Sequence, residues 1–193
     1  MSDYANFKEA LSLLAEAVSQ VKAAGGIEPV LVGGGAVEFY TSGRFLSGDL
    51  DLVAPQIEAI EEALIAVGFE RSRGIGQPRR GVVHPELKIG VEVVSGALMD
   101  GRTDRARIRV LDIGQGRTLR IIPPEDLIAD RVAQALSVRS PDKAMIAQAV
   151  LLFRLVQDID EVYLDERISF ETSGEAGLST LKMWASDNAE HEL

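Results

Sequence analysis

The chain has no cysteine, no long apolar run and only two histidines among its 193 residues. Without cysteine, disulfides and thiolate chemistry are excluded, and the composition is consistent with a cytoplasmic protein. No apolar stretch reaches the roughly 20 residues of a transmembrane helix, and the N-terminus lacks the basic-then-apolar order of a signal peptide. We therefore expect no membrane segment. His84 and His191 stand alone in sequence, in neither a Ser-His-Asp arrangement nor a zinc-ligand spacing.

Basic residues are also in short supply, with 20 Lys and Arg against 30 Asp and Glu and a formal charge of −10. This balance argues against broad nonspecific binding of nucleic acid, which depends on a basic surface. RNA stays open as a substrate, because a local basic track can form from Arg71, Arg73, Arg79, Arg80, Arg102, Arg105, Arg107 and Arg109. The alternative is that these arginines form a solvated surface that balances an acidic protein.

The length suits one domain with a small helical appendage, or two small lobes. Apolar residues spaced by three and four predict a helix over 4–24, which Gly25 and Gly26 end. Shorter runs up to residue 122 predict a mixed sheet with early helices. Strands are expected at 27–32, 50–53, 69–73, 87–95, 107–113 and 117–122, helices at 33–41 and 55–67, and an exposed loop at 74–81.

Two features decide the fold class. Gly114-Gln115-Gly116 predicts a hairpin. Because a hairpin joins two antiparallel strands, it argues against an all-parallel sheet. From Pro123 the pattern becomes helical, over 125–138, 142–157 and in shorter helices to residue 185. We therefore predict an α+β fold, with a mixed β-sheet core and N-terminal helix in a domain of residues 1–122. A C-terminal helical lobe is predicted for residues 123–193.

A glycine turn, Gly33-Gly34-Gly35, follows the first predicted strand. It does not fit a dinucleotide fingerprint, because Glu38 stands where the last glycine belongs and would face a pyrophosphate at a helix N-terminus. A P-loop is excluded as well, since no Gly-Lys-Ser/Thr follows. Taken alone, three glycines favour a tight turn between a strand and a helix.

The pair Asp49 and Asp51, which follows the glycine turn, is a candidate metal-binding site. Residues two apart on a strand point to the same face, so both carboxylates lie on one side while Leu50 points into the core. An isolated Asp-x-Asp is usually a solvated strand end. Here apolar residues bracket the pair, half-buried carboxylates need a partner, and Arg44 is the one nearby base. Magnesium, which prefers carboxylate oxygens and substrate phosphates, is the better explanation.

A two-metal site needs a third carboxylate, for which Glu92 is the candidate. Glu92 is a lone acid in the apolar run Ile89 to Val94. An outward-facing residue on a solvated sheet face is an equal alternative for it. Asp100 and Asp112 are weaker candidates, because both lie next to turn signals.

These residues, in this order, resemble the DNA polymerase β-like nucleotidyltransferase superfamily. Its signature is Gly-Gly or Gly-Ser, about a dozen residues, then Asp-hydrophobic-Asp/Glu-hydrophobic; this chain has Gly34-Gly35 and then Asp49-Leu50-Asp51-Leu52. Ser47-Gly48 resembles the small step often found before the pair. The later run Pro124 to Arg131 is similar to a helix start in the bacterial branch that includes abortive-infection toxins.

The resemblance implies a nucleotidyltransferase-like mixed sheet flanked by helices, and roles for particular residues. Asp49, Asp51 and Glu92 would be catalytic and would bind two Mg²⁺ ions. A nucleoside triphosphate would be held by Gly33, Gly34, Gly35, Arg44, Ser47, Arg131 and Asp142. Two departures matter: glycine replaces a serine that touches the triphosphate in many members, and Glu92 replaces the commoner aspartate.

The leading interpretation is a magnesium-dependent transfer of a nucleoside monophosphate to an acceptor hydroxyl on RNA, protein or a small molecule. The protein would then be a candidate toxin of a toxin–antitoxin or phage-defence pair, with an antitoxin as its partner. A second interpretation is a catalytically silent nucleotidyltransferase-like domain that binds a nucleotide or a partner protein. A third is an unrelated α+β domain whose Asp pair caps a sheet edge. The sequence does not indicate an oligomeric state.

Overall fold

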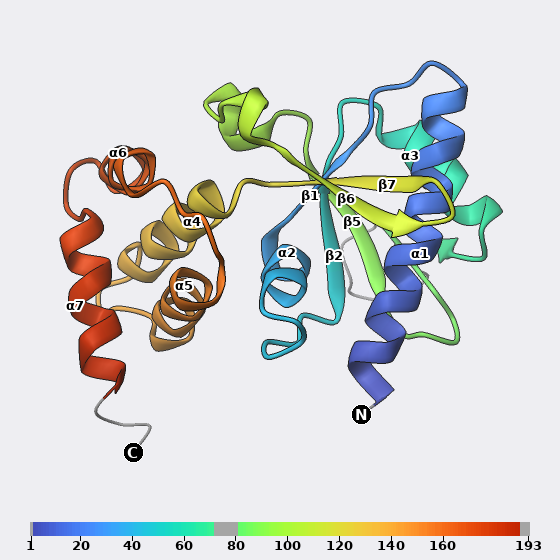
Figure 1. Ribbon diagram of the computed structural model, residues 1–193. Helices are drawn as coiled ribbons and strands as arrows, with labels where there is room; N and C mark the ends of the chain where they lie inside the picture. The colour runs from blue at the N-terminus through green and yellow to red at the C-terminus, as the bar shows by residue number, and fades with distance from the viewer. Residues whose placement is uncertain (1, 72–80, 190–193) are drawn as a thin grey trace. The chain divides into compact units, whose positions relative to one another are not determined.

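The computed structural model describes residues 2–71 and 81–189 of the chain. Contacts between residues divide the chain into two compact units (Figure 1). The first unit comprises residues 1–38 and 46–122, and the second comprises residues 39–45 and 123–193. The division into domains 1–122 and 123–193 stays a prediction, and the structure groups the short segment 39–45 with the later helices.

The described helices and strands follow one another in a mixed order. The helices are α1 (Ser2–Ala23), α2 (Gly33–Tyr40), α3 (Ile57–Ala66), α4 (Pro124–Leu136), α5 (Lys143–Leu155), α6 (Glu161–Glu171) and α7 (Leu178–Ala189). The strands are β1 (Val30–Val32), β2 (Asp49–Val53), β3 (Glu70–Arg71), β4 (Val82–Val83), β5 (Gly90–Ser95), β6 (Arg109–Gly114) and β7 (Arg117–Ile121). Two short 3₁₀ turns, η1 (Leu98–Gly101) and η2 (Arg105–Arg107), lie between β5 and β6.

The seven strands form one sheet in the order β3-β4-β5-β2-β1-β7-β6. Strands β2 and β5 run parallel, as do β1 and β7, whereas the other neighbours are antiparallel. The turn at Gly114-Gln115-Gly116 joins β6 to β7 as predicted, and all three residues have positive φ. The predicted α+β class, a mixed sheet flanked by helices, is therefore confirmed.

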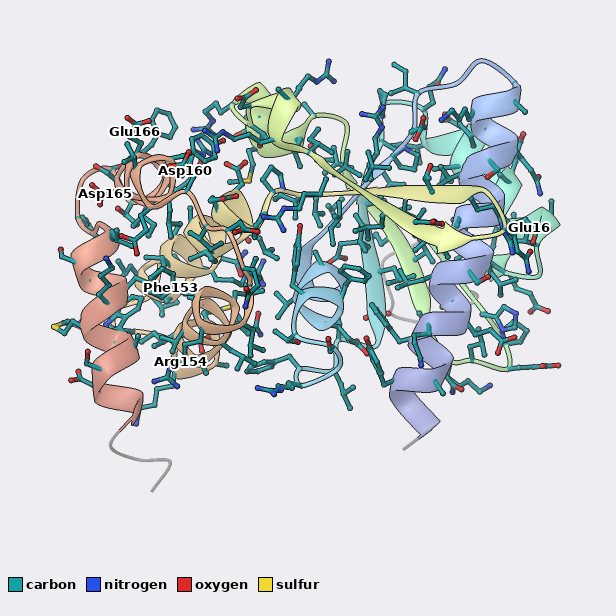
Figure 2. The ribbon with its side chains drawn as sticks, in the orientation of Figure 1. Glu16, Phe153, Arg154, Asp160, Asp165 and Glu166 are labelled. Carbon is teal, nitrogen blue, oxygen red and sulfur yellow. The ribbon has the colours of Figure 1, made fainter. Side chains whose placement is uncertain are left out.

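One face of the sheet forms the core of the first unit. Its side chains are almost fully buried: Leu31, Leu50, Leu52, Val91, Leu119 and Ile121. Helix α1 packs against α3 and β7, and Figure 1 shows α1 and α3 on the same side of the sheet. Glu16 on α1, labelled in Figure 2, pairs with Arg117 at 2.9 Å and ties the hairpin to the helix. On the opposite face of the sheet, β2 and β5 carry the polar residues Asp49, Asp51 and Glu92 beside the buried valines Val30, Val32 and Val53.

The predicted elements agree with the structure apart from their ends. The helix over 55–67 begins two residues late, at Ile57, and the strand at 27–32 is shortened to Val30–Val32. Strand β4, only two residues long, was not predicted, because so short a run carries no periodicity. The loop predicted at 74–81 lies outside the described residues up to position 80, as do Arg73, Arg79 and Arg80. Within the described ranges, every helix is too short or too polar to cross a membrane.

The second unit is a helical cluster with a charged centre. Helix α4 packs against α5 and α6, and α7 packs against both α5 and α6. The Asp126 carboxylate on α4 is fully buried and accepts hydrogen bonds from Arg167 at 2.5 Å and from the Tyr163 hydroxyl. Arg167 also pairs with Glu171 at 2.6 Å. Buried ion pairs of this kind hold two helices in one arrangement, because either charge alone would be costly to bury.

Burial makes this centre sensitive to pH. Burial raises the pKa of the Asp126 carboxyl, and the Arg167 guanidinium beside it offsets part of that rise. In the first unit, the hydrogen bond from Lys22 lowers the pKa of Glu28. The contributions of these two carboxyl groups to the free energy of unfolding therefore change with pH in opposite directions.

We expect Arg167→Met to lower the free energy of unfolding by about 3–5 kcal/mol at pH 7, since it leaves the Asp126 carboxylate buried without its cation. Urea unfolding followed by circular dichroism measures the change. The control is Lys182→Met, which removes the half-exposed pair with Glu161 and should cost no more than about 1 kcal/mol. Equal losses for the two variants would contradict a structural role for the buried pair.

The raised pKa of Asp126 predicts a contribution to stability that is present below its unfolded pKa of about 3.9 and is lost as the pH rises through the folded value. Asp126→Asn removes this contribution. The difference in the free energy of unfolding between the variant and the parent protein should therefore change with pH above about 4. Glu28→Gln should behave oppositely, because its lowered pKa gives stability that is lost as the pH falls. The check is urea unfolding between pH 3 and pH 7. A pH-independent difference for Asp126→Asn contradicts the expectation.

Candidate active site

The three predicted acids lie on two neighbouring strands. Asp49 and Asp51 belong to β2, and Glu92 belongs to β5. The parallel register sets Asp51 opposite Glu92 and Asp49 opposite Gly90. Paired residues of adjacent strands point to the same face of a sheet, and so do residues two apart on one strand. The three carboxylates therefore share one face, and Leu50 and Val91 between them face the buried core.

The acids suit a hard cation by chemistry, since Mg²⁺ prefers carboxylate oxygens. Asp49 is exposed, and Asp51 and Glu92 are half-buried, so the face is open enough for a substrate to reach. Among residues 2–71 and 81–189, however, no three His, Asp or Glu side chains are grouped closely enough to hold a metal ion. The register brings the donors to one face, and their role as ligands stays a prediction.

Each aspartate of β2 lies close to a glycine, Asp51 to Gly33 and Asp49 to Gly90. Gly33 has φ +59°, and a Cβ at this position would overlap the Oδ2 atom of Asp51. A Cβ at Gly90 would overlap the Oδ1 atom of Asp49. Each carboxylate thus occupies the space that a side chain would fill. Only glycine at positions 33 and 90 leaves room for the two carboxylates as they are placed, which supports a site built around them.

The glycine turn itself forms the first turn of α2. The leading N–H groups of a helix have no partner within the helix and attract anions such as phosphate. A Cβ at Gly34 would overlap the Ser47 hydroxyl, which itself donates to the Asp49 carbonyl at 3.0 Å. Gly34 and Ser47 are therefore in close contact, and Ser47 fixes the backbone at the start of β2.

Glu38 has a role that the sequence did not reveal. Its side chain is only 2% exposed, and its carboxylate accepts a hydrogen bond from the Ser47 N–H at 2.8 Å. Glu38 thereby links α2 to the segment that leads into β2. A charged residue between Val37 and Phe39 on an otherwise apolar helix was the available signal. Gly90 was missed as well, because its contact with Asp49 depends on strand register.

The remaining predicted site residues belong to the second unit. Arg44 is exposed on the segment 39–45, and its backbone N–H donates to the Thr41 carbonyl. Arg131 on α4 is buried and pairs with Asp130, and it also lies within 3.4 Å of the Gln148 side-chain oxygen.

Asp142 is the N-cap of α5. Its carboxylate accepts hydrogen bonds from the N–H groups of Ala144 at 2.8 Å and Met145 at 3.4 Å. This capping accounts for an aspartate at the position, since Asp is among the preferred N-cap residues. The proposed roles of Arg44, Arg131 and Asp142 toward a nucleotide stay predictions.

Gly33→Ala should lower the free energy of unfolding by about 1–3 kcal/mol, because it forces a side chain into a left-handed backbone and against Asp51. Gly96→Ala is the matched control, since Gly96 has ordinary φ and open space around its Cβ. This control should change stability by less than about 1 kcal/mol. Urea unfolding of the two variants provides the comparison, and an unaffected Gly33→Ala protein would disprove the close fit against Asp51.

Comparisons with known proteins agree with this architecture at the level of fold. No protein-family profile matches the sequence, and no curated protein matches it significantly. Among solved structures, an antigenic nucleotidyltransferase-like protein from Paracoccidioides brasiliensis matches with a TM-score of 0.58 and 15% identity, over 94% of this chain and 92% of that one. The antibiotic-resistance factor ANT(2″)-Ia matches with a TM-score of 0.50 and 13% identity, over 95% and 97%. The chain therefore has the fold of nucleotidyltransferase-like proteins.

Proposed function

We propose that this protein is a metal-dependent nucleotidyltransferase that moves a nucleoside monophosphate from a nucleoside triphosphate to an acceptor hydroxyl. The observation that carries the proposal is the register of β2 and β5, which sets Asp51 opposite Glu92 on the face that also bears Asp49. Two further observations support it: the glycine turn in contact with Asp51, and the likeness in fold to nucleotidyltransferase-like proteins.

In the proposed reaction, the acids would bind metal ions, and the glycine turn and an arginine would bind phosphate. Asp49 and Asp51 would hold the Mg²⁺ ion at the triphosphate, and Asp51 with Glu92 would hold a second ion at the acceptor. Bound Mg²⁺ supplies electrostatic stabilisation of the charge that develops on the phosphate oxygens. The backbone N–H groups of Gly34 and Gly35 would donate to phosphate oxygens at the helix N-terminus. Arg44 or Arg131 would pair with phosphate, which guanidinium binds bidentately.

In the reaction, the acceptor oxygen forms a bond to the α-phosphorus, and the bond from that phosphorus to the bridging oxygen breaks. Pyrophosphate leaves with the bonding electron pair, and the proton of the acceptor hydroxyl passes to solvent water. The acceptor class is open among RNA, protein and small molecules. A toxin of a toxin–antitoxin or phage-defence pair, acting on RNA, is the finer form of the proposal, and it would add an antitoxin as partner.

A catalytically silent domain is a second candidate, and two observations favour it. Arg131 is already paired with Asp130. The three carboxylates share a face, but among the described residues they do not lie close enough together to hold a metal ion. Such a domain would bind a nucleotide or a partner protein. It would give a thermal shift with a non-hydrolysable triphosphate and no transfer to any acceptor fraction, and a partner would still bind after Asp49→Asn.

We expect Asp51→Asn to lower nucleotidyl transfer at least about 100-fold, because losing even a supporting group of a metal site costs 10- to 100-fold. The assay incubates the protein with Mg²⁺ and a triphosphate labelled at the α-phosphate, together with separate cell fractions of RNA, protein and metabolites. A triphosphate labelled at the γ-phosphate should transfer nothing. Asp112→Asn is the control, since Asp112 is exposed on the edge strand β6 and caps Gly114.

Three outcomes would overturn the proposal: transfer of the γ-label, α-label transfer that survives Asp51→Asn, or equal losses in Asp51→Asn and Asp112→Asn. The fraction that takes up the label identifies the acceptor class. Label in RNA supports the toxin form, whereas label in the metabolite fraction favours a small-molecule acceptor.

A further inference from the structure

The outer edge of strand β6 is open. β6 is six residues long, lies at the end of the sheet order and has β7 as its neighbour. In an antiparallel strand, alternate residues direct their N–H and C=O groups away from the neighbouring strand. In the described part of the chain, no segment beyond β7 forms backbone hydrogen bonds with residues 110–113. The free edge is therefore a row of donors and acceptors with which another strand can pair.

The middle of β6 is apolar and regular. Proteins usually protect an open edge with proline, charged side chains or a bulge. β6 has no proline, and its register shift lies at its far end, between Asp112 and Gly114. Its charged residues, Arg109 and Asp112, leave Val110 and Leu111 between them. Val110 is 61% exposed, the largest exposed fraction among the large apolar side chains described in the first unit. A strand paired at this edge would cover it.

The apolar middle of β6 faces both sides of the sheet. Val110 pairs with Arg120 of β7, which in turn pairs with Val30 of β1. Val110 therefore lies on the face that bears the acids of β2 and β5. Leu111 lies on the core face, where α1 contacts both β6 and β7. A strand added to β6 would bury apolar side chains on both faces.

The charges of β6 favour a second copy of the same strand, running in the opposite direction. Arg109 begins β6, and Asp112 lies near its end. An antiparallel copy sets the basic start of each strand beside the acidic end of the other, which is electrostatically favourable. A parallel copy in register would instead set arginine beside arginine and aspartate beside aspartate, and like charges placed in this way destabilise a sheet.

One antiparallel register suits these side chains best. With Val110 opposite its counterpart, Arg109 lies opposite Leu111 and Asp112 lies opposite Ile108, so that no like charges are directly opposed. A register centred on Arg109 would oppose two arginines, and one centred on Leu111 would set the exposed Val110 opposite Asp112. The register centred on Val110 covers the apolar side chain and keeps the like charges apart.

We propose that β6 pairs with β6 of a second copy of this chain, antiparallel and centred on Val110, so that the two sheets join into one. The backbone groups of the two edges supply the hydrogen bonds, and the two valines cover each other. A two-fold axis through the sheet keeps its faces, so both α1 helices lie on one face, on either side of the axis, and add contact area. The proposal does not depend on the transferase activity.

A disulfide tests the register, because the chain has no cysteine of its own. Directly opposed residues of antiparallel strands have Cα atoms about 4.5–5.5 Å apart, which a disulfide can span. Mild oxidation should therefore link most of the Val110→Cys protein into a dimer on a non-reducing gel. Val94→Cys is the matched control, since Val94 is 51% exposed on the interior strand β5, and it should stay mainly monomeric. Equal linking of the two variants, or none in Val110→Cys, overturns the proposal.

Sedimentation of the parent protein tests the association itself and should show a monomer–dimer equilibrium. Val110→Lys opposes two cations across the axis and should weaken dimerisation at least about tenfold, whereas Val94→Lys should leave it unchanged. Hydrogen exchange of the amides of residues 110–113 should slow as the protein concentration rises. A parent protein that stays monomeric at millimolar concentration refutes the pairing. So does a dimer that Val110→Lys and Val94→Lys affect equally.

Discussion

The parallel pairing of β2 with β5 is the constraint on which the candidate active site depends. It sets the carboxylates of Asp51 and Glu92 directly opposite each other, and like charges in that position destabilise a sheet. The buried residues beneath them, Leu50 and Val91, fix the register, because a slip by one residue would bring the acids into the core. The apolar face of the sheet thus keeps the charged face in its arrangement.

The backbone around the acids is as specific as the acids themselves. Gly33 and Gly90 leave room for the two aspartates of β2, and Gly34 leaves room for the Ser47 hydroxyl. Glu38 then anchors the Ser47 backbone from α2. These contacts join the N-terminus of α2, the two aspartates and the segment between them within one unit of the chain. The proposed phosphate chemistry depends on this arrangement.

Local signals predicted much of this arrangement. Asp49 and Asp51 could be placed on one face from the period of a strand, and the hairpin at Gly114–Gly116 from its turn residues. Which face Glu92 occupies could not be derived, because a lone acid on a strand fits either side until the register is known. Contacts between distant residues, such as Gly90 with Asp49 and Glu38 with Ser47, were beyond prediction for the same reason.

Mn²⁺ in place of Mg²⁺ offers the most direct test of the central claim, that the acids of β2 and β5 form a metal site. Its unpaired electrons broaden the NMR signals of nearby amides, so a titration in the presence of a non-hydrolysable triphosphate locates the ion on the chain. The account predicts broadening centred on residues 49–51 and on Glu92, with the amides of Gly33 to Gly35 affected next. Broadening centred elsewhere, or no broadening at concentrations that saturate the triphosphate, would contradict it.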